Sequence, residues 1–169
     1  MKKIILLLVM LFPMVANAIK IEKNEVDDFT GNRTVVTSWE RFCGKTIVYI
    51  RFSLENNEQF LDYKMVTDGA IVIPKDAKLM IKSDESMATL NSIDTYSGGK
   101  GQGAVGMNAS GCWGIFATYT GDLSWFGENS SEVLRAYASG EYYDRKFSDK
   151  DGEKLKSLYL LFADTIANN

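Results

Sequence analysis

The chain has 169 residues, of which 46% are hydrophobic, 24% charged and 12% aromatic. This length fits one domain, and the composition excludes a disordered chain, a collagen-like fibre and a disulfide-dense mini-protein. The net charge is −3 and there is no histidine, so we expect no nucleic-acid partner and exclude Ser-His-Asp and Cys-His catalysis and His-ligated zinc. We expect no metal and no cofactor.

The N-terminal segment has the three parts of a secretory signal peptide. Lys2 and Lys3 form a basic start, residues 4–12 are an unbroken apolar run, and Ala16 and Ala18 fit an A-x-A cleavage site. The run is shorter than the ~20 residues that span a bilayer, although a retained anchor or a buried helix is the alternative. We expect cleavage after Ala18 and a single domain over residues 19–169, periplasmic or secreted, with no transmembrane span.

The body that follows has the pattern of successive short strands, with turn signals about every ten residues. The turns include Asn56-Asn57-Glu58 and a hairpin-type Thr67-Asp68-Gly69. This spacing favours an antiparallel meander, sandwich or partial barrel over βαβ units. The predicted strands, some seven or eight in number, cover residues 19–23, 34–42, 46–54, 60–66, 70–73, 78–82, 87–96 and 113–120.

A short helix is predicted after these strands. Asn129 and Glu132 have capping-box spacing, and apolar residues then recur at helical spacing from Val133 to Ala138. Gly140 suits the residue that follows a helix C-terminus. Residues 141–147 have the composition of a further strand.

A longer helix is predicted at the C-terminus. Ser148 and Asp151 form a second capping-box pattern, and an apolar stripe follows them. The expected fold class is therefore α+β: an antiparallel sheet or sandwich packed by a short helix and a longer C-terminal helix. The stripe consists of Leu155, Leu158, Tyr159, Phe162 and Ile166.

The start of the body resembles that of small exported bacterial proteins. The stretch Asp28-Phe29-Thr30-Gly31, followed by Thr37 and Trp39, is similar to the D-x-F-T-G…T-x-W opening of those proteins. The resemblance covers about fifteen residues. It implies a β-rich exported domain and brings no known activity or site.

Three short motifs are better explained by ordinary structure than by chemistry. Residues 101–106 match G-x-G-x-x-G but are not followed by a helical stripe, as a dinucleotide site requires. Ser97 and Lys100 match S-x-x-K, but two glycines between them disfavour the helix that this motif needs. Residues 149–152 have the wrong ligand spacing for an EF-hand loop.

A glycine-rich segment is the predicted binding region. Residues 97–111 contain six glycines and no apolar periodicity, and aromatic residues flank them. Such a loop is either functional or a mobile connection, and its aromatic neighbours stack on a ligand or belong to the core. We expect Trp39, Tyr49 and Phe52 in the core. The candidate binding residues are Tyr96, Gly99, Gly101, Gly103, Trp113, Tyr119 and Trp125.

The predicted export bears on the redox state of the two cysteines, Cys43 and Cys112. An oxidising compartment favours a disulfide between them, whereas two buried thiols are the alternative. The bond would close a long loop and restrict the unfolded chain.

Three functions are compatible with these features. We favour a non-catalytic exported domain that binds an envelope protein or a glycan. A small carboxylate-dependent hydrolase of envelope sugars is the first alternative and requires paired acids across a cleft. An inhibitor or immunity-type protein is the second. The candidate acids near loops and strand ends are Asp94, Asp122, Glu128 and Asp144.

Overall fold

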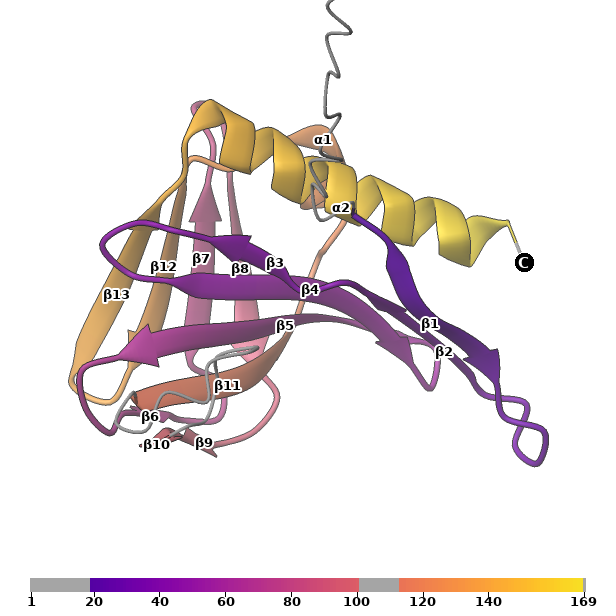
Figure 1. Cartoon of the computed structure of the whole chain (residues 1–169), viewed down its shortest axis with the longest axis horizontal. Coiled ribbons are helices and arrows are strands. Elements are labelled where there is room, and N and C mark those ends of the chain that lie inside the picture. Colours follow the sequence, from indigo (N-terminus) through magenta and orange to yellow (C-terminus); the bar gives the residue numbers. More distant parts are fainter. Residues whose placement is uncertain (1–18, 101–112, 169) are drawn as a thin grey trace, which may run out of the picture.

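The computed structural model describes residues 19–100 and 113–168, which form strands and two helices (Figure 1). The helices are α1 (Trp125–Glu128) and α2 (Asp149–Ala167). The strands are β1 (Ile21–Val26), β2 (Arg33–Thr37), β3 (Glu40–Phe42), β4 (Val48–Glu55), β5 (Glu58–Thr67), β6 (Val72–Ile73), β7 (Lys78–Lys82), β8 (Met87–Ser92), β9 (Tyr96–Ser97), β10 (Gly99–Lys100), β11 (Trp113–Thr120), β12 (Val133–Ala138) and β13 (Glu141–Lys146).

Most strands belong to one bent antiparallel sheet with the order β1-β2-β4-β5-β11-β8-β7-β12-β13. β3 adds to β4, β10 adds to β11, and β6 and β9 form a separate two-stranded sheet. The pairing of β11 with β8 covers only Tyr119 with Ser92 and Thr120 with Asn91. At this short junction the sheet changes direction, so β7, β8, β12 and β13 run across the direction of β4 and β5 (Figure 1).

The β4–β5 hairpin fixes the register of the first half of the sheet. Asn56 and Asn57 form its two-residue turn and have φ angles of 52° and 64°, which asparagine tolerates better than most residues. The turn pairs Glu55 with Glu58 and continues as far as Val48 with Met65. The predicted turn at this position is confirmed.

Helix α2 covers the core that the bent sheet encloses. Ser148 accepts a hydrogen bond from the Asp151 amide while Asp151 accepts one from the Ser148 amide, so the predicted capping box is confirmed. The apolar stripe faces inward: Tyr159 and Phe162 pack on Phe52 with ring centroids 5.3 and 5.8 Å away. Within the described ranges, neither helix combines the length and the apolarity that crossing a membrane demands.

The short helix predicted from Asn129 onward is wrong, because residues 133–138 form strand β12. Leu134 and Ala136 point into the core and Arg135 points out, so the period is two. Gly140 has a φ of 84° in the turn between β12 and β13 and does not end a helix. The actual short helix, α1, lies earlier and places Trp125 and Phe126 in the core.

Other differences concern strand breaks. The predicted strand over 34–42 divides into β2 and β3, and the one over 87–96 divides into β8 and β9. The turn at 67–69 does not close a hairpin, because β6 pairs with β9 and not with β5. The α+β class and the antiparallel sheet are confirmed, with more strands than expected.

Candidate functional site

The outer face of the sheet carries the polar and aromatic side chains that a ligand could reach. Along each strand one set of residues faces the core, such as Ile50, Leu61 and Ile115, all of which are fully buried. The alternate residues face outward. Two hollows lie on this outer face, one over each half of the sheet.

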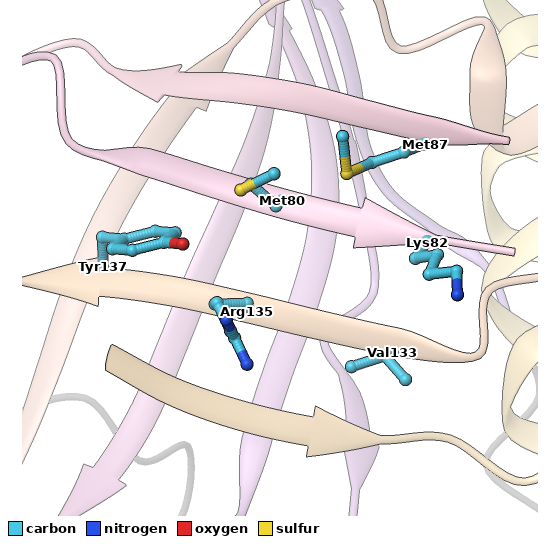
Figure 2. A pocket seen from close by; sticks show the side chains of 6 residues that line it. All are labelled: Met80, Lys82, Met87, Val133, Arg135 and Tyr137. Carbon is cyan, nitrogen blue, oxygen red and sulfur yellow. The ribbon is translucent and has the colours of Figure 1, made fainter. Parts of the chain in front are cut away.

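The first hollow lies over β7, β8 and β12, and we call it the methionine groove. Figure 2 shows its side chains, among them Met80 on β7 and Met87 on β8. Its volume is about 270 Å³ and its surface is mainly apolar. Two of the lining residues are cations and none is an acid. The lining residues are Met80, Lys82, Met87, Val133, Arg135 and Tyr137.

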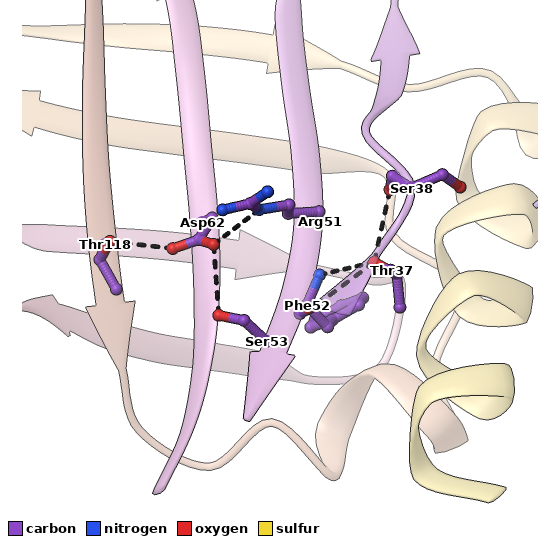
Figure 3. A network of polar contacts seen from close by, with 7 residues as sticks. All are labelled: Thr37, Ser38, Arg51, Phe52, Ser53, Asp62 and Thr118. Atoms are coloured by element: carbon purple, nitrogen blue, oxygen red, sulfur yellow. Dashed lines mark hydrogen bonds and ion pairs between the residues drawn. The ribbon is translucent and has the colours of Figure 1, made fainter. Parts of the chain in front are cut away.

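The second hollow lies beside a group that we call the Trp39 cluster: Trp39, Arg51, Lys64 and Phe116. Trp39 follows a bend at the end of β2. There the Thr37 hydroxyl oxygen accepts a hydrogen bond from the Phe52 amide at 2.9 Å, in place of a backbone carbonyl (Figure 3). Trp39 was predicted to lie in the core but is half-buried. Tyr49 and Phe52 are buried, as predicted.

Two cations lie against the Trp39 ring. The Arg51 guanidinium carbon is 4.4 Å from the ring centroid and the Lys64 Nζ atom is 4.1 Å from it. Phe116 meets Trp39 edge to face at 6.0 Å and is 38% exposed. Such contacts attract the cations through the electron-rich ring faces and hold both rings in place.

The two cations differ in how they are paired. Arg51 forms an ion pair with Asp62, whereas no ion pair joins Lys64 to a carboxylate among the described residues. Burial lowers the pKa of Lys64 and the charge of Arg51 lowers it further, whereas the charge of Asp62 partly opposes this shift. Lys64 is therefore a half-buried amine whose positive charge an anion would stabilise.

Asp62 is the polar centre beneath the cluster. The residue is only 4% exposed. Its carboxylate accepts hydrogen bonds from Arg51 Nε at 2.8 Å, Thr118 Oγ1 at 2.9 Å and Ser53 Oγ at 3.2 Å (Figure 3). These donors come from β4 and β11, on the two sides of β5. Within the described part of the chain, Arg51 joins this network through Nε and not through its terminal nitrogens.

The hollow beside the cluster has a volume of about 280 Å³ and equal polar and apolar surface. Arg51, Asp62 and Phe116 connect it to the Trp39 cluster, and Glu55 lies at its hairpin end. An aromatic wall, hydroxyl groups and a guanidinium in one hollow are suited to a polar ligand with a flat apolar face. The remaining lining residues are Thr34, Val36, Ser53, Leu54, Phe60, Ile93 and Thr118.

One of the predicted binding residues, Tyr96, reaches this site, whereas Trp113 has the inward phase of β11 that it shares with Ile115. Tyr96 on β9 is half-buried and lies 6.4 Å from the Phe116 ring. Gly99 pairs with Gly114, one residue after the half-buried Trp113 at the start of β11. Tyr96 thus extends the aromatic surface of the Trp39 cluster.

Tyr119 and Trp125, two further predicted binding residues, do not reach this site. Tyr119 is fully buried in the core, and its hydroxyl has no hydrogen-bond partner among the described residues. Trp125 is 9% exposed in α1 and donates a hydrogen bond to Ser86 Oγ at 2.8 Å. Gly101 and Gly103 lie outside the described residues, as do residues 104–106 of the same glycine motif.

The disulfide stays a prediction, because Cys112 lies outside the described residues. Cys43 is exposed in the turn between β3 and β4 and forms no disulfide within the described part of the chain. Its carbonyl oxygen accepts a hydrogen bond from the buried Arg145. Intact mass before and after reduction with thiol alkylation would test the bond.

Three of the four candidate acids accept hydrogen bonds from nearby residues. Asp144 binds Arg135 with two hydrogen bonds of 2.6 and 2.7 Å. Asp122 accepts hydrogen bonds from the Ser124 amide and hydroxyl, and Asp94 accepts one from the Thr95 amide. Glu128 is exposed at the end of α1. Within the described ranges, no cluster of three or more acids or cysteines could hold a metal ion.

Comparison of the chain with protein-family models, with curated proteins and with solved structures finds no match. The functional argument therefore depends on the geometry of the site. Sequence reasoning missed Arg51, Lys64 and Phe116, and it assigned Trp39 to the core. The signal that could have found them is the outward phase of the strand pattern, which places charges at 51, 62 and 64 between apolar residues.

Proposed function

We propose that this protein is a non-catalytic exported binding domain whose Trp39 cluster takes an acidic sugar. The exported location is the one predicted from residues 1–18. The observation that carries the proposal is Lys64, a half-buried amine 4.1 Å from the Trp39 centroid and 5.7 Å from the Phe116 centroid that forms no ion pair with a carboxylate of the described residues.

An acidic sugar matches each part of this surface. A pyranose ring has a flat apolar face that packs on Phe116 and Tyr96, which together form a continuous aromatic surface. Its carboxylate would pair with Lys64 and with the terminal nitrogens of Arg51. Its hydroxyls would donate to Glu55 and exchange hydrogen bonds with Ser53 and Thr118 in the hollow.

The arrangement favours binding over chemistry. Asp62 is the acid at the centre of the hollow, and it already accepts hydrogen bonds from Arg51, Ser53 and Thr118. A general acid or nucleophile needs a reachable carboxyl group with a second acid across the cleft. The rigid, fully bonded Asp62 instead holds Arg51 in position for a ligand.

Calorimetric titration with a uronic-acid oligosaccharide tests the proposal, with its carboxyl-reduced neutral form as the matched probe. We expect binding of the acidic form and at least about tenfold weaker binding of the neutral form. Lys64→Met and Phe116→Ala should each weaken binding by about tenfold or more, while Lys78→Met, on the other half of the sheet, should leave it unchanged. Equal binding of the two probes, or binding of neither, would contradict the proposal.

A pH series adds a second readout. Because the pKa of Lys64 is lowered by burial and by Arg51, the amine loses its proton at a lower pH than an ordinary lysine. Binding of the acidic probe should therefore weaken as the pH rises toward that lowered pKa. Lys64→Met should abolish this pH dependence.

A further inference from the structure

The loop between β1 and β2 carries a phenylalanine whose side chain is almost completely exposed to solvent. Phe29 is 99% exposed, and Val26 beside it is 59% exposed. Both lie at the far end of the β1–β2 hairpin, which projects from the body of the molecule (Figure 1). Phe29 and Val26 together place apolar surface at this tip, and burial of that surface against a second molecule would be favourable.

The loop holds this phenylalanine in a fixed position. Asp27 Oδ1 accepts hydrogen bonds from the Phe29 amide at 2.9 Å, the Thr30 amide at 2.7 Å and the Thr30 hydroxyl at 2.9 Å. Gly31, with a φ of 71°, returns the chain and donates to the Asp27 carbonyl oxygen. Asn32 binds the Asn56 side chain of the neighbouring hairpin at 2.8 Å.

These bonds explain the residues of the D-x-F-T-G opening. The aspartate and the threonine close the loop, the glycine supplies the left-handed backbone conformation, and the phenylalanine side chain is left almost fully exposed. A loop that is already ordered loses little conformational entropy when its exposed residue is buried. The loop therefore has the physical properties of a docking element.

The methionine groove has the complementary properties. It is an apolar hollow of about 270 Å³, and Met80 and Met87 supply flexible thioethers that contact aromatic rings favourably. Lys82 and Arg135 border it; Arg135 is paired with Asp144, and Glu132 lies near Lys82. The Phe29 tip, by contrast, carries three acids: Asp28, Asp27, which accepts the hydrogen bonds of the loop, and Glu25, which pairs with Lys23 at 3.3 Å.

We propose that Phe29 of one copy occupies the methionine groove of a second copy, with the acidic tip next to Lys82. The hairpin tip and strand β12 lie toward opposite ends of the longest axis (Figure 1). A copy therefore binds its neighbour through two different surfaces. Such a head-to-tail contact leaves one tip and one groove free at each end and extends into a chain or closes into a ring.

Sedimentation velocity of the mature domain over a concentration series tests this contact. We expect the wild type to grow in mass with concentration and to dissociate as salt is added, since salt screens the charged rim. Phe29→Ser and Met87→Glu should each lower the association constant by more than about tenfold. Leu160→Ser, which removes a different exposed apolar residue from α2, should associate like the wild type.

Mixing the two defective variants gives the decisive measurement. F29S keeps its groove and M87E keeps its Phe29 tip, so a mixture should form a dimer with one copy of each and nothing larger. A wild type that stays monomeric up to its solubility limit would overturn the proposal. So would a mixture that stays monomeric, or a monomeric wild type that binds uncharged phosphatidylcholine vesicles through Phe29.

Discussion

Asp62 and Arg51 lie opposite each other across the β4–β5 hairpin, with Arg51 Nε 2.8 Å from Asp62 Oδ2. The arginine is also stacked on Trp39, with its guanidinium carbon 4.4 Å from the ring centroid. One hairpin therefore fixes both the polar centre of the site and the position of the aromatic ring above it.

Asp62→Ala should destabilise the protein by about 3 kcal/mol. The substitution leaves Arg51, Ser53 and Thr118 without their shared acceptor in a mostly buried setting. Urea unfolding followed by circular dichroism measures the change. Asp68→Ala, an exposed acid just after β5, is the matched control and should stay within about 0.5 kcal/mol of the wild type. An equal effect of the two variants would show that the network contributes little.

Ser148→Ala should cost about 1 kcal/mol, because it removes the side-chain acceptor for the Asp151 amide at the start of α2. Ser157→Ala, an exposed position in the same helix, should be neutral or slightly stabilising, since alanine is the better helix former. The free energy of unfolding is measured for both variants. A larger loss for Ser148→Ala than for Ser157→Ala indicates capping and not general helix propensity. The capping argument fails if Ser148→Ala is the milder change.

Gly140→Ala and Gly69→Ala separate backbone conformation from packing. A Cβ atom would meet no other atom within 4 Å at either position, but only Gly140 has a left-handed φ, 84°. Gly140→Ala should therefore lower the free energy of unfolding by about 1 kcal/mol, and Gly69→Ala should not. Thermal unfolding at neutral pH provides the comparison. Equal melting temperatures would contradict the turn assignment at 139–140.

The protein should lose stability in alkaline solution. Burial is the main cause that raises the pKa of Tyr63, Tyr119 and Tyr159 above the ordinary 10.0. Burial and a hydrogen bond to Glu141 raise the pKa of Tyr143 to about 12. The folded state keeps these protons while the unfolded chain releases them, so the stabilisation is complete below pH 10 and falls as the pH rises through the folded values.

The free energy of unfolding should therefore decrease between about pH 8 and about pH 12. Over the same range, the absorbance of ionised tyrosine should rise at a higher pH in the folded protein than in the unfolded chain. Tyr119→Phe should reduce the slope of this decrease. At neutral pH the same variant should be neutral or more stable, because it removes a buried hydroxyl that has no partner among the described residues. Tyrosines that all ionise near pH 10 in the folded protein would contradict this account.

Part of the site could be predicted from the sequence alone. A two-residue turn at Asn56-Asn57 fixes which residues face each other, so it places Arg51 opposite Asp62 and Tyr49 opposite Lys64. The alternation of strand residues then puts Arg51, Asp62 and Lys64 on the same outward face. Short-range turn geometry was sufficient for this half of the site.

The remainder depends on contacts that no local pattern contains. Phe116 reaches Trp39 only because β11 pairs with β5, far away in the sequence. Trp39 follows the point where the Thr37 hydroxyl accepts a hydrogen bond from the Phe52 amide, a contact between strands that the pattern of residues 34–42 does not contain. Residues 133–138 fit both a helical and a strand period, and the pairing of β12 with β7 and β13 decided between them.

Arg33, at the start of β2, donates hydrogen bonds to the carbonyl oxygens of Thr165 at 2.8 Å and Ile166 at 3.3 Å, at the end of α2. A cation at this position favours the negative end of the helix dipole. The β1–β2 hairpin is thus joined to the last turn of α2, and Phe52 packs on two rings of that same helix. During synthesis the β1–β2 hairpin cannot make these contacts until helix α2 has left the ribosome, so this part of the fold forms only after residues 149–167 have emerged.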